Sequence, residues 1–312
     1  MKLVSYKAKA NQSSARMGFI VENKVVDLQE SYRLAMFAEE NLSAIEEIDK
    51  ELPACPNAFY RIGQPAFDKA KAAYEYSLQV DKSDVISLDR EKVTLETPIP
   101  EPRKIICIGR NYIEHAAEME SDVPEFPVLF TKYATSLIGP EDAIEKTPQT
   151  EKLDYEVELC IVVGKEAREV KKEDAFAYIA GYTIGNDTTA RDLQKRTPQW
   201  LQGKAIDRTS PIGPWVVSAD ELSDPANLNV RSYVNGEKRQ DSNTNKLIFD
   251  VPFLMEFISH LVTLEPGDII MTGTPDGVGV AMKPPQFLQA GDIVTLEIEN
   301  IGTLENKVID RP

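Results

Sequence analysis

Three carboxylates occupy every second position of an otherwise apolar stretch near the middle of the sequence. Residues 153 to 164 read LDYEVELCIVVG, so Asp154, Glu156 and Glu158 alternate with apolar residues. A β-strand turns successive side chains to opposite faces, which would place the three carboxylates on one face. Like charges this close repel each other, and burying them unpaired is costly. Taken alone, the stretch is more often the solvated face of an antiparallel strand.

A second polar group lies in the segment NDTTARDLQKR. Asp187 ends a strand-like run and begins a helix-like one, and Arg191 and Gln194 follow at i+4 and i+7. This spacing predicts that the three side chains share one helical face. An acid, a cation and an amide displayed together suit an anion bound beside a metal. An ordinary ion pair between Asp187 and Arg191 explains this segment alone slightly better.

If the two groups meet in the fold, their acids form a candidate metal site. Glu156, Glu158 and Asp187 offer hard oxygen ligands, which suit Mg²⁺ or Mn²⁺ and, less specifically, Ca²⁺. A zinc site rich in histidine or cysteine is disfavoured, because the chain has only two histidines and neither a CxxC nor an HxxxH motif. A divalent cation would turn the repulsion among the carboxylates into binding.

The segment GRNYIEHAAEME contains a candidate acid–base pair. Asn111 can begin a helical turn, which would bring His115 and Glu118 side by side at i and i+3. A carboxylate beside an imidazole orients the ring and raises its basicity, which suits general-base catalysis on water. An isolated HxxE is more often part of an exposed polar helix. His260 is predicted to be structural or exposed, and a lone lysine such as Lys204 is usually a solvated charge.

The elements that must position these residues fall into two regions. Residues 1–95 begin with a hairpin predicted around Glu22 and Asn23, and residues 29–80 favour helix. Prolines in TPIPEPRK then mark a boundary. Residues 96–312 contain many short strands, with the strongest hairpin signal at Asn235 and Gly236.

This organisation predicts an α+β fold that is mainly β, with a closed or rolled β core and helices packed outside. A small α/β N-terminal domain of residues 1–95 would precede a catalytic domain of residues 96–312. A helix is predicted after residue 250, with Asp250 near its N-cap and Pro252 in the first turn.

Composition excludes several classes of partner. The formal net charge of −16 offers no electrostatic footprint for nucleic acid or for an anionic membrane. No run reaches 18 apolar residues and no signal peptide is evident, so neither a membrane span nor secretion is expected. The three cysteines, Cys55, Cys107 and Cys160, form no close pair and are expected to be free thiols in a reducing compartment. A cytoplasmic location follows.

The sequence lacks the common motifs of nucleotide-binding proteins and serine hydrolases. The glycines of GTPDGVGV do not have the spacing of a dinucleotide fingerprint, and the segment does not lead into a helix. The sequence also contains neither a P-loop nor a GxSxG nucleophile elbow.

Six motifs occur in one order between residues 97 and 280: TPIPEPRKIICIGRNYIEHAAEM, PVLFTKYATSLIGP, LDYEVEL, GYTIGNDTTARDLQ, QGKAIDRTSPIGPWVV and LEPGDIIMTGTPDGVG. Together they resemble the catalytic domain of the fumarylacetoacetate hydrolase superfamily. The resemblance is greatest to its acylpyruvase and oxaloacetate decarboxylase branch, with 2-hydroxyhepta-2,4-diene-1,7-dioate isomerases as near relatives. The first 95 residues resemble the short extra N-terminal domain of bacterial members.

The resemblance implies a mixed β-roll, a homodimer and one Mg²⁺ or Mn²⁺ in each active site. It implies that Asp154 is a neighbour of the metal and not a ligand. The remaining motif residues match metal ligands (Glu156, Glu158, Asp187), residues that grip the substrate's carboxylate and keto oxygens (Arg191, Gln194, Lys204, Thr274) and a His–Glu pair on a lid segment (His115, Glu118). His115, Glu118 and Lys204 are then the candidate catalytic residues.

The implied reaction is cleavage of a C–C bond in a small 2-oxo or 1,3-dicarbonyl acid through a metal-stabilised enolate. Oxaloacetate decarboxylation and acylpyruvate hydrolysis are expected first. The alternatives are isomerisation of a dienedioate in aromatic catabolism, and a non-catalytic regulatory protein that retains the fold. One enolate serves all three activities, so these residues do not separate them.

The motifs also depart from the family pattern at the expected pocket wall. Tyr133 stands where many relatives carry Pro or Ser, and Arg208 and Ser210 stand where Thr and Cys are frequent. Arg208, if it lies near the site, would favour a dianionic substrate such as oxaloacetate.

Overall fold

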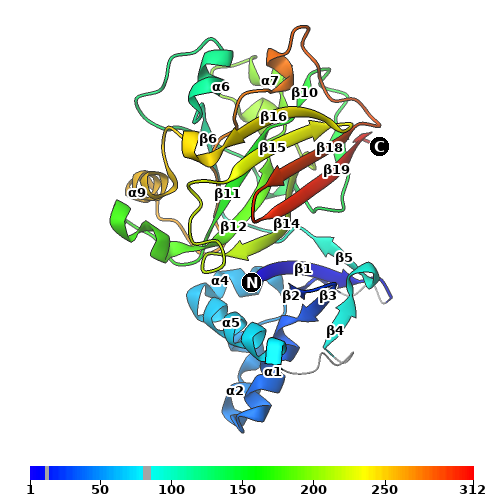
Figure 1. Cartoon of the computed structure of the whole chain (residues 1–312), viewed down its shortest axis with the longest axis vertical. Helices are drawn as coiled ribbons and strands as arrows, with labels where there is room; N and C mark the ends of the chain where they lie inside the picture. The colour runs from blue at the N-terminus through cyan, green and yellow to red at the C-terminus, as the bar shows by residue number, and fades with distance from the viewer. Residues whose placement is uncertain (11–13, 80–85) are drawn as a thin grey trace.

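Strands from both predicted regions meet in one long sheet (Figure 1). The computed structural model describes residues 1–10, 14–79 and 86–312. In chain order, the strands of this sheet are β1 (Lys2–Ala8), β2 (Arg16–Val21), β3 (Lys24–Asp27), β4 (Ser87–Asp89), β5 (Val93–Glu96), β6 (Ile105–Gly109), β7 (Val128–Thr131), β8 (Leu137–Ile138), β11 (Val157–Val163), β12 (Ile179–Asn186), β14 (Ser210–Ser218) and β17 (Ile269–Met271). Their main path is β4-β3-β2-β1-β14-β12-β11-β17-β6-β7, with β5 on β1 and β8 on β14.

A second sheet packs against the middle of the first. Its strands are β9 (Ile144–Lys146), β15 (Asn229–Val234), β16 (Glu237–Asn243), β18 (Ile293–Ile298) and β19 (Gly302–Asp310), in the order β16-β15-β18-β19-β9. Buried apolar side chains of β11 and β12 meet those of β15, β18 and β19 in one core. Most neighbours are antiparallel, but β6–β17, β8–β14 and β9–β19 are parallel. The fold is therefore mixed and mainly β, as predicted.

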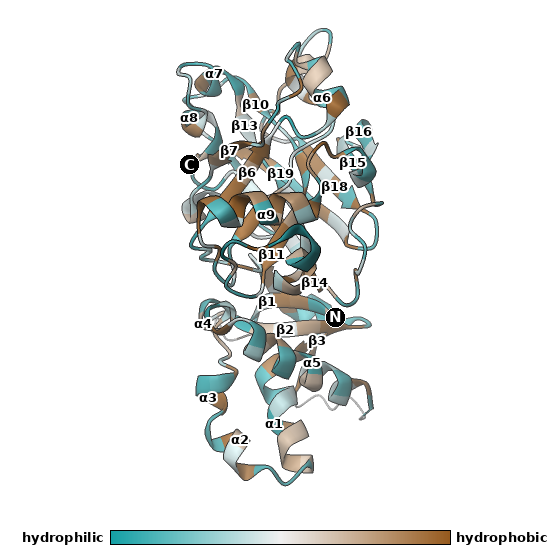
Figure 2. Cartoon of the chain, turned by 90° about the vertical axis from the view of Figure 1, so that its left-hand side faces the viewer, coloured by the Kyte–Doolittle hydropathy of each residue, from teal (hydrophilic) through white to brown (hydrophobic). Residues whose placement is uncertain are grey.

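Helices cover the outside of the sheets and fill the N-terminal region. The N-terminal helices are α1 (Leu28–Ala38), α2 (Leu42–Glu46), α3 (Ile48–Glu51), α4 (Pro56–Ile62) and α5 (Gln64–Gln79). Those after residue 96 are α6 (Ile113–Glu118), α7 (Arg191–Gln194), α8 (Leu201–Lys204) and α9 (Val251–Leu261). Short 3₁₀ turns lie at Arg90–Lys92, Ala134–Ser136, Lys172–Tyr178, Thr244–Lys246 and Gly279–Ala281. In Figure 2, α9 and the strands beside it are largely brown, which marks the apolar layer between them.

Local signals in the sequence located several of these elements. The hairpin predicted at Glu22 and Asn23 joins β2 to β3, and the one at Asn235 and Gly236 joins β15 to β16. Asn235 and Gly236 both have positive φ, as a two-residue hairpin turn requires. Asp250 caps α9 by accepting from the Phe253 N–H at 2.8 Å. Helix was favoured from residue 29 to 80, and residue 80 itself lies outside the described residues.

The predicted boundary after residue 95 falls at the end of β5. β1 pairs with β14 of the main sheet, so the N-terminal α/β region continues a sheet that the rest of the chain builds. A second apolar core joins β1, β2 and the N-terminal helices to the far face of β11. The division into two domains at this point stays a prediction.

The state of the cysteines and the lengths of the helices agree with what the sequence predicts. All three cysteines are free thiols, as predicted, with Cys107 and Cys160 buried and Cys55 exposed. In the described part of the chain, each helix is too short or too polar to cross a bilayer. The cytoplasmic location stays a prediction.

Candidate active site

The acidic stretch becomes two strands with a break between them. β10 (Leu153–Asp154) pairs with β13 (Thr189–Ala190), and β11 starts at Val157. The alternating apolar residues all enter the first core: Leu153, Tyr155, Val157, Leu159 and Ile161. Glu158 faces the other way, on the same side as Cys160 and Val162. On the N-terminal side of Cys160, Glu156 and Glu158 line a pocket.

Asp187 joins Glu156 and Glu158 because β11 and β12 are paired. Val157 lies opposite Asn186, and the next residue, Asp187, donates its backbone N–H to the Glu156 carbonyl at 2.9 Å. One carboxylate oxygen from each of the three acids lies within 4.8 Å of the other two, and all three residues are buried. The structure thus brings the predicted ligand set together.

Cations neutralise two of these acids. Lys204, at the end of α8, donates to Glu156 Oε2 at 2.7 Å and to Asp187 Oδ2 at 2.5 Å. Arg191 Nη2 lies 2.7 Å from Glu156 Oε1, and Lys132 donates to Asp187 Oδ1 at 2.8 Å. Lys204 is therefore a buried, paired group and not the solvated charge that a lone lysine usually is.

Glu158 differs from its two neighbours. It accepts the Gly273 N–H at 2.8 Å, and no lysine or arginine of the described residues forms an ion pair with it. Burial, together with the charges of Asp187 and Glu156, raises the pKa of Glu158 well above its usual value. Burial also disfavours ionised Glu156, but Lys204 and Arg191 outweigh it and lower the pKa of Glu156 to about 2. The site therefore holds one buried carboxyl group that lacks a positive partner.

This donor set fits a hard divalent cation. Three carboxylates with close oxygens are the ligands that Mg²⁺ and Mn²⁺ prefer. A cation held by Glu156, Glu158 and Asp187 would also give Glu158 the positive charge that it lacks. The same triad contains no nitrogen or sulfur donor, which argues against a zinc site.

Arg191 is held by Asp154 and not by Asp187. Asp154 Oδ2 accepts from Arg191 Nε at 2.8 Å, and Asp154 also accepts the N–H groups of Gly279 and Val280. The expected helical face from Asp187 to Gln194 was wrong, because Thr189 and Ala190 form β13 and the helix begins only at Arg191. Gln194 remains beside Arg191, with 3.4 Å between Gln194 Oε1 and Arg191 Nη1.

His115 and Glu118 lie side by side on α6, as their spacing predicts. The distance from His115 Nδ1 to Glu118 Oε2 is 3.3 Å, and Glu118 Oε1 accepts the Gly277 N–H at 2.9 Å. Glu118 therefore fixes one ring nitrogen and leaves Nε2 for the pocket. Asn111 does not start this helix, which begins at Ile113. Its buried side chain instead bonds to backbone atoms of other segments.

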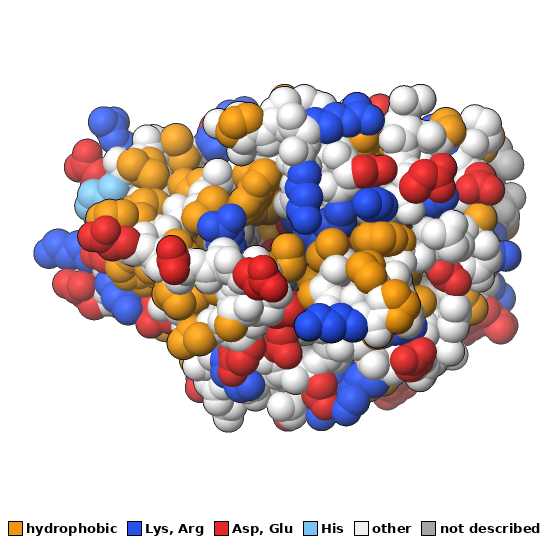
Figure 3. Space-filling model, turned by 90° about the horizontal axis from the view of Figure 1, so that it is seen from above, with side chains coloured by type: hydrophobic (Ala, Val, Ile, Leu, Met, Phe, Trp, Pro, Cys, Tyr) orange, Lys and Arg blue, Asp and Glu red, His pale blue; other side chains and the backbone are white. Residues whose placement is uncertain are grey.

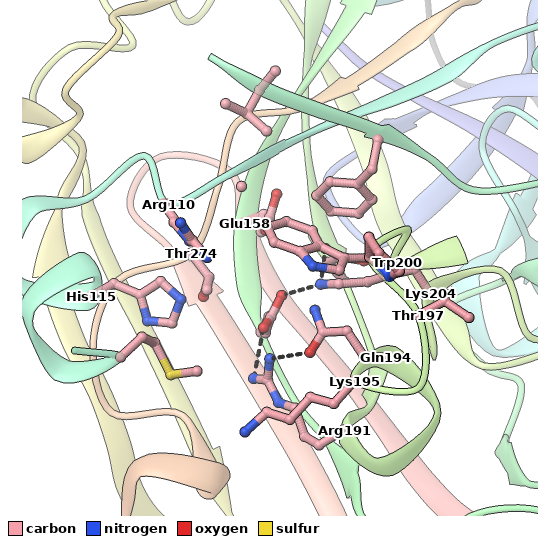
Figure 4. A pocket seen from close by; sticks show the side chains of 17 residues that line it. Arg110, His115, Glu158, Arg191, Gln194, Lys195, Thr197, Trp200, Lys204 and Thr274 are labelled. Atoms are coloured by element: carbon pink, nitrogen blue, oxygen red, sulfur yellow. Dashed lines mark hydrogen bonds and ion pairs between the residues drawn. The ribbon is translucent and has the colours of Figure 1, made fainter. Parts of the chain in front are cut away.

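These residues surround one cavity of about 340 Å³, within the usual range for small-molecule sites. Figure 3 shows a hollow near the middle of the face that carries α6 and α7, with basic side chains gathered beside it. Of the residues predicted to bind metal, bind substrate or act in catalysis, all but Glu118 line the cavity, and Glu118 contacts His115, which does. Figure 4 shows His115 on the side of the cavity opposite Gln194 and Lys204.

Two buried polar residues of the site were not predicted. Lys132 follows β7, where it shares a strand face with Phe130, which lines the cavity. This alternation in VLFTK was the available signal. Gln240 donates to Thr274 Oγ1 at 2.7 Å, which leaves the Thr274 hydroxyl hydrogen free for the cavity. Nothing local in the sequence indicates Gln240, because it reaches the site from the second sheet.

The three residues that depart from the family pattern do not lie at the pocket wall. Arg208 pairs with Glu145 and lies 3.8 Å from Asp142, on the outside of the molecule. Tyr133 is 53% exposed, and none of Tyr133, Arg208 and Ser210 lines the cavity. The suggestion that Arg208 selects a dianionic substrate was therefore wrong.

Comparison with known proteins agrees with this geometry. Residues 104–309 match the family model described as fumarylacetoacetate (FAA) hydrolase C-terminal. The chain belongs to the fumarylacetoacetate hydrolase family. It is 42% identical over 271 residues to the mitochondrial oxaloacetate tautomerase of Xenopus laevis, covering 86% of this chain and 83% of the relative.

Solved structures of the family share the whole fold. A 2-hydroxyhepta-2,4-diene-1,7-dioate isomerase from Mycobacterium marinum is 30% identical, with a TM-score of 0.72 over 99% of this chain and 98% of that one. A maleylpyruvate hydrolase from Sphingobium sp. SYK-6, solved with manganese(II) and pyruvate, is 27% identical, with a TM-score of 0.76 over the full length of both chains. The predicted β-roll of this family, with its N-terminal α/β region, is therefore confirmed.

Proposed function

We propose that this family member is a Mg²⁺- or Mn²⁺-dependent enzyme that interconverts the keto and enol forms of a small 2-oxo acid, with oxaloacetate as the first candidate. The observation that carries the proposal is the buried Glu156–Glu158–Asp187 triad, which lines the same small cavity as His115 of the His–Glu pair. Relatives that are 42% identical and named oxaloacetate tautomerases support the choice of reaction.

The residues divide the work of enolisation among them. Glu156, Glu158 and Asp187 would hold a divalent cation, which would supply positive charge to stabilise an enolate. Arg191 and Lys204 add positive charge at the same end, where Gln194 and Thr274 donate hydrogen bonds. His115 Nε2 removes a proton from C3 of the keto form and delivers it, directly or through water, to the 2-oxo oxygen, which gives the enol. The reverse transfers return the proton from the enol oxygen to C3.

C–C bond cleavage, expected first from the motifs, is the second candidate. The His115–Glu118 pair could also activate water against a distal carbonyl, and the manganese-containing maleylpyruvate hydrolase is a relative with such a name. Decarboxylation of oxaloacetate would pass through the same enolate. A homodimer and a cytoplasmic location remain part of the proposal.

A single assay separates these reactions. Metal-stripped protein is mixed with enol-oxaloacetate, and the loss of enol absorbance and the appearance of pyruvate are followed with and without Mg²⁺ or Mn²⁺. The expected result is metal-dependent loss of the enol without matching pyruvate, and Glu158→Gln abolishes it. Pyruvate at the rate of enol loss would favour decarboxylation. No rate above that of the Glu158→Gln control would contradict enolate chemistry on this substrate.

A further inference from the structure

An exposed arginine stands at the rim of the cavity without an acidic partner. Arg110 lines the cavity, and the centre of its guanidinium group lies 5.7 Å from the centroid of the Trp200 ring. Across the described parts of the chain, no carboxylate forms an ion pair with Arg110. It differs in this from Arg191 and Lys204, which are both paired with acids at the inner end. The rim therefore holds a positive charge that is free for a ligand.

The backbone holds Arg110 in an unfavourable conformation. Its φ is +59°, a region that residues other than glycine seldom occupy. Both neighbours fix it there. A Cβ on Gly109 would lie 2.5 Å from Trp200 Cζ3, and Asn111 is completely buried, with its side chain bonded to Phe249 and Thr272. Glycine would fit residue 110 without strain, so an arginine held at this φ indicates a use for its side chain.

The position of Arg110 matches a second carboxylate on the substrate. Figure 4 places Arg110 across the cavity from Arg191 and Lys204, and the acidic triad lines the same cavity. A 2-oxo acid held at the triad by its first carboxylate and oxo group would extend its remaining carbons toward this rim. A guanidinium group binds a carboxylate through two parallel hydrogen bonds, and the adjacent Trp200 ring limits its rotation.

We propose that Arg110 binds the distal carboxylate of a dicarboxylic 2-oxo acid and so selects dianionic substrates. The inference rests on the proposed function, because it assumes that the triad holds the 2-oxo acid end. It assigns to Arg110 the selectivity that the sequence suggested for Arg208.

Binding of two unreactive ligands tests this selectivity apart from catalysis. Malate and lactate share a 2-hydroxy acid end, but only malate has a distal carboxylate, and neither can form the enol of a 2-oxo acid. Each is titrated by calorimetry into Mn²⁺-loaded protein, for the wild type and for Arg110→Met. We expect malate to bind the wild type at least about tenfold more tightly than lactate, from one charge-assisted hydrogen-bonded pair. Arg110→Met should remove that advantage and leave lactate within twofold.

Two further variants control for charge and folding. Arg196→Met removes an exposed arginine nearby that does not line the cavity, and it should keep the preference for malate. Arg110→Gly removes the side chain and relieves the positive-φ strain, so it should lose the preference without a fall in Tm. An unchanged malate-to-lactate ratio in Arg110→Met would overturn the proposal, as would equal loss of both ligands.

The outcome for the proposed function is read separately. Oxaloacetate enol turnover is measured on the same wild-type sample. Absent turnover with an intact, Arg110-dependent preference for malate would contradict the tautomerase function and support the role of Arg110. Normal turnover with no preference for malate would contradict the role of Arg110 alone.

Discussion

The Nζ of Lys204 lies 2.7 Å from Oε2 of Glu156, and both groups are buried. This ion pair explains how the acidic stretch between β10 and β11 can be folded into the interior. The same ammonium group reaches Asp187, so two of the three acids are already compensated. Of the three acids, Glu158 alone forms no ion pair with a lysine or arginine of the described residues. The difference between Glu156 and Glu158 gives most of the predictions below.

Removing the charge of Glu156 or of Glu158 should have opposite effects on the metal-free protein. Glu156→Gln leaves Arg191 and Lys204 short of a buried partner, and breaking such a pair costs about 3–5 kcal/mol. Glu158→Gln removes a buried carboxyl group that has no cation, so the free energy of unfolding should stay equal or rise. Urea unfolding of the two variants beside the wild type measures this. Equal destabilisation by both would contradict the charge assignment.

The stability of the metal-free protein should depend on pH in a direction that Glu158 sets. Because the pKa of Glu158 is raised, the native state keeps a proton that the unfolded chain releases at mildly acidic pH. The free energy of unfolding should therefore fall as pH rises above the usual carboxyl pKa, and Glu158→Gln should flatten this fall. Glu156 acts in the opposite direction, because its pKa is lowered to about 2 in the folded protein. Its contribution to the free energy of unfolding is present above the usual carboxyl pKa and is lost as the pH drops toward 2. Tm scans from pH 3 to pH 8 check both slopes, and a wild-type slope that Glu158→Gln leaves intact would contradict the first.

His115 should matter for rate more than for binding. His115→Gln should lower kcat for enol turnover by about 10²–10⁴, the usual contribution of a general base. Glu118→Gln keeps the shape of its side chain and should cause a smaller loss, because it only orients the imidazole. Steady-state kinetics with saturating Mg²⁺ measure both variants. A KM effect with unchanged kcat would show that His115 binds substrate and does not transfer the proton.

Lys132 should stabilise the metal-free site. Its completely buried side chain donates to Asp187 Oδ1 and to the Thr188 carbonyl. Lys132→Met keeps the aliphatic stem but leaves Asp187 with less positive charge, so about 3–5 kcal/mol of unfolding free energy should be lost. Saturating Mn²⁺ should restore part of it. Unfolding with and without Mn²⁺ tests this, and an identical loss in both conditions would place Lys132 outside the electrostatics of the site.

Sequence patterns located what depends on near neighbours. Both two-residue hairpins, the cap at Asp250 and the apolar face of the acidic stretch follow from residue types within a few positions. The His115–Glu118 pair is equally local. The family resemblance of the six motifs predicted that Asp187 lies beside Glu156 and Glu158. The spacing of these residues alone did not decide this.

Interactions between distant segments were beyond these patterns. Strand pairing and a short β13 override the helical spacing after Asp187, so Arg191 pairs with Asp154. Lys204 is buried where it pairs with two acids from other segments, Glu156 before β11 and Asp187 after β12. Arg208 pairs with Glu145 on the outer surface, whereas Arg110 lines the cavity and has no ion pair with the acids that the structure describes. Each difference comes from a partner that is far away in the sequence.

Titration of metal-stripped protein with Mn²⁺, for the wild type and for Glu158→Gln, tests the central claim most directly. The claim is that Glu156, Glu158 and Asp187 together hold one divalent cation. The wild type should bind one Mn²⁺ per chain, and the variant should bind at least about tenfold more weakly although its fold is no less stable. Equal Mn²⁺ affinity in both proteins, or no binding to the wild type, would contradict the claim.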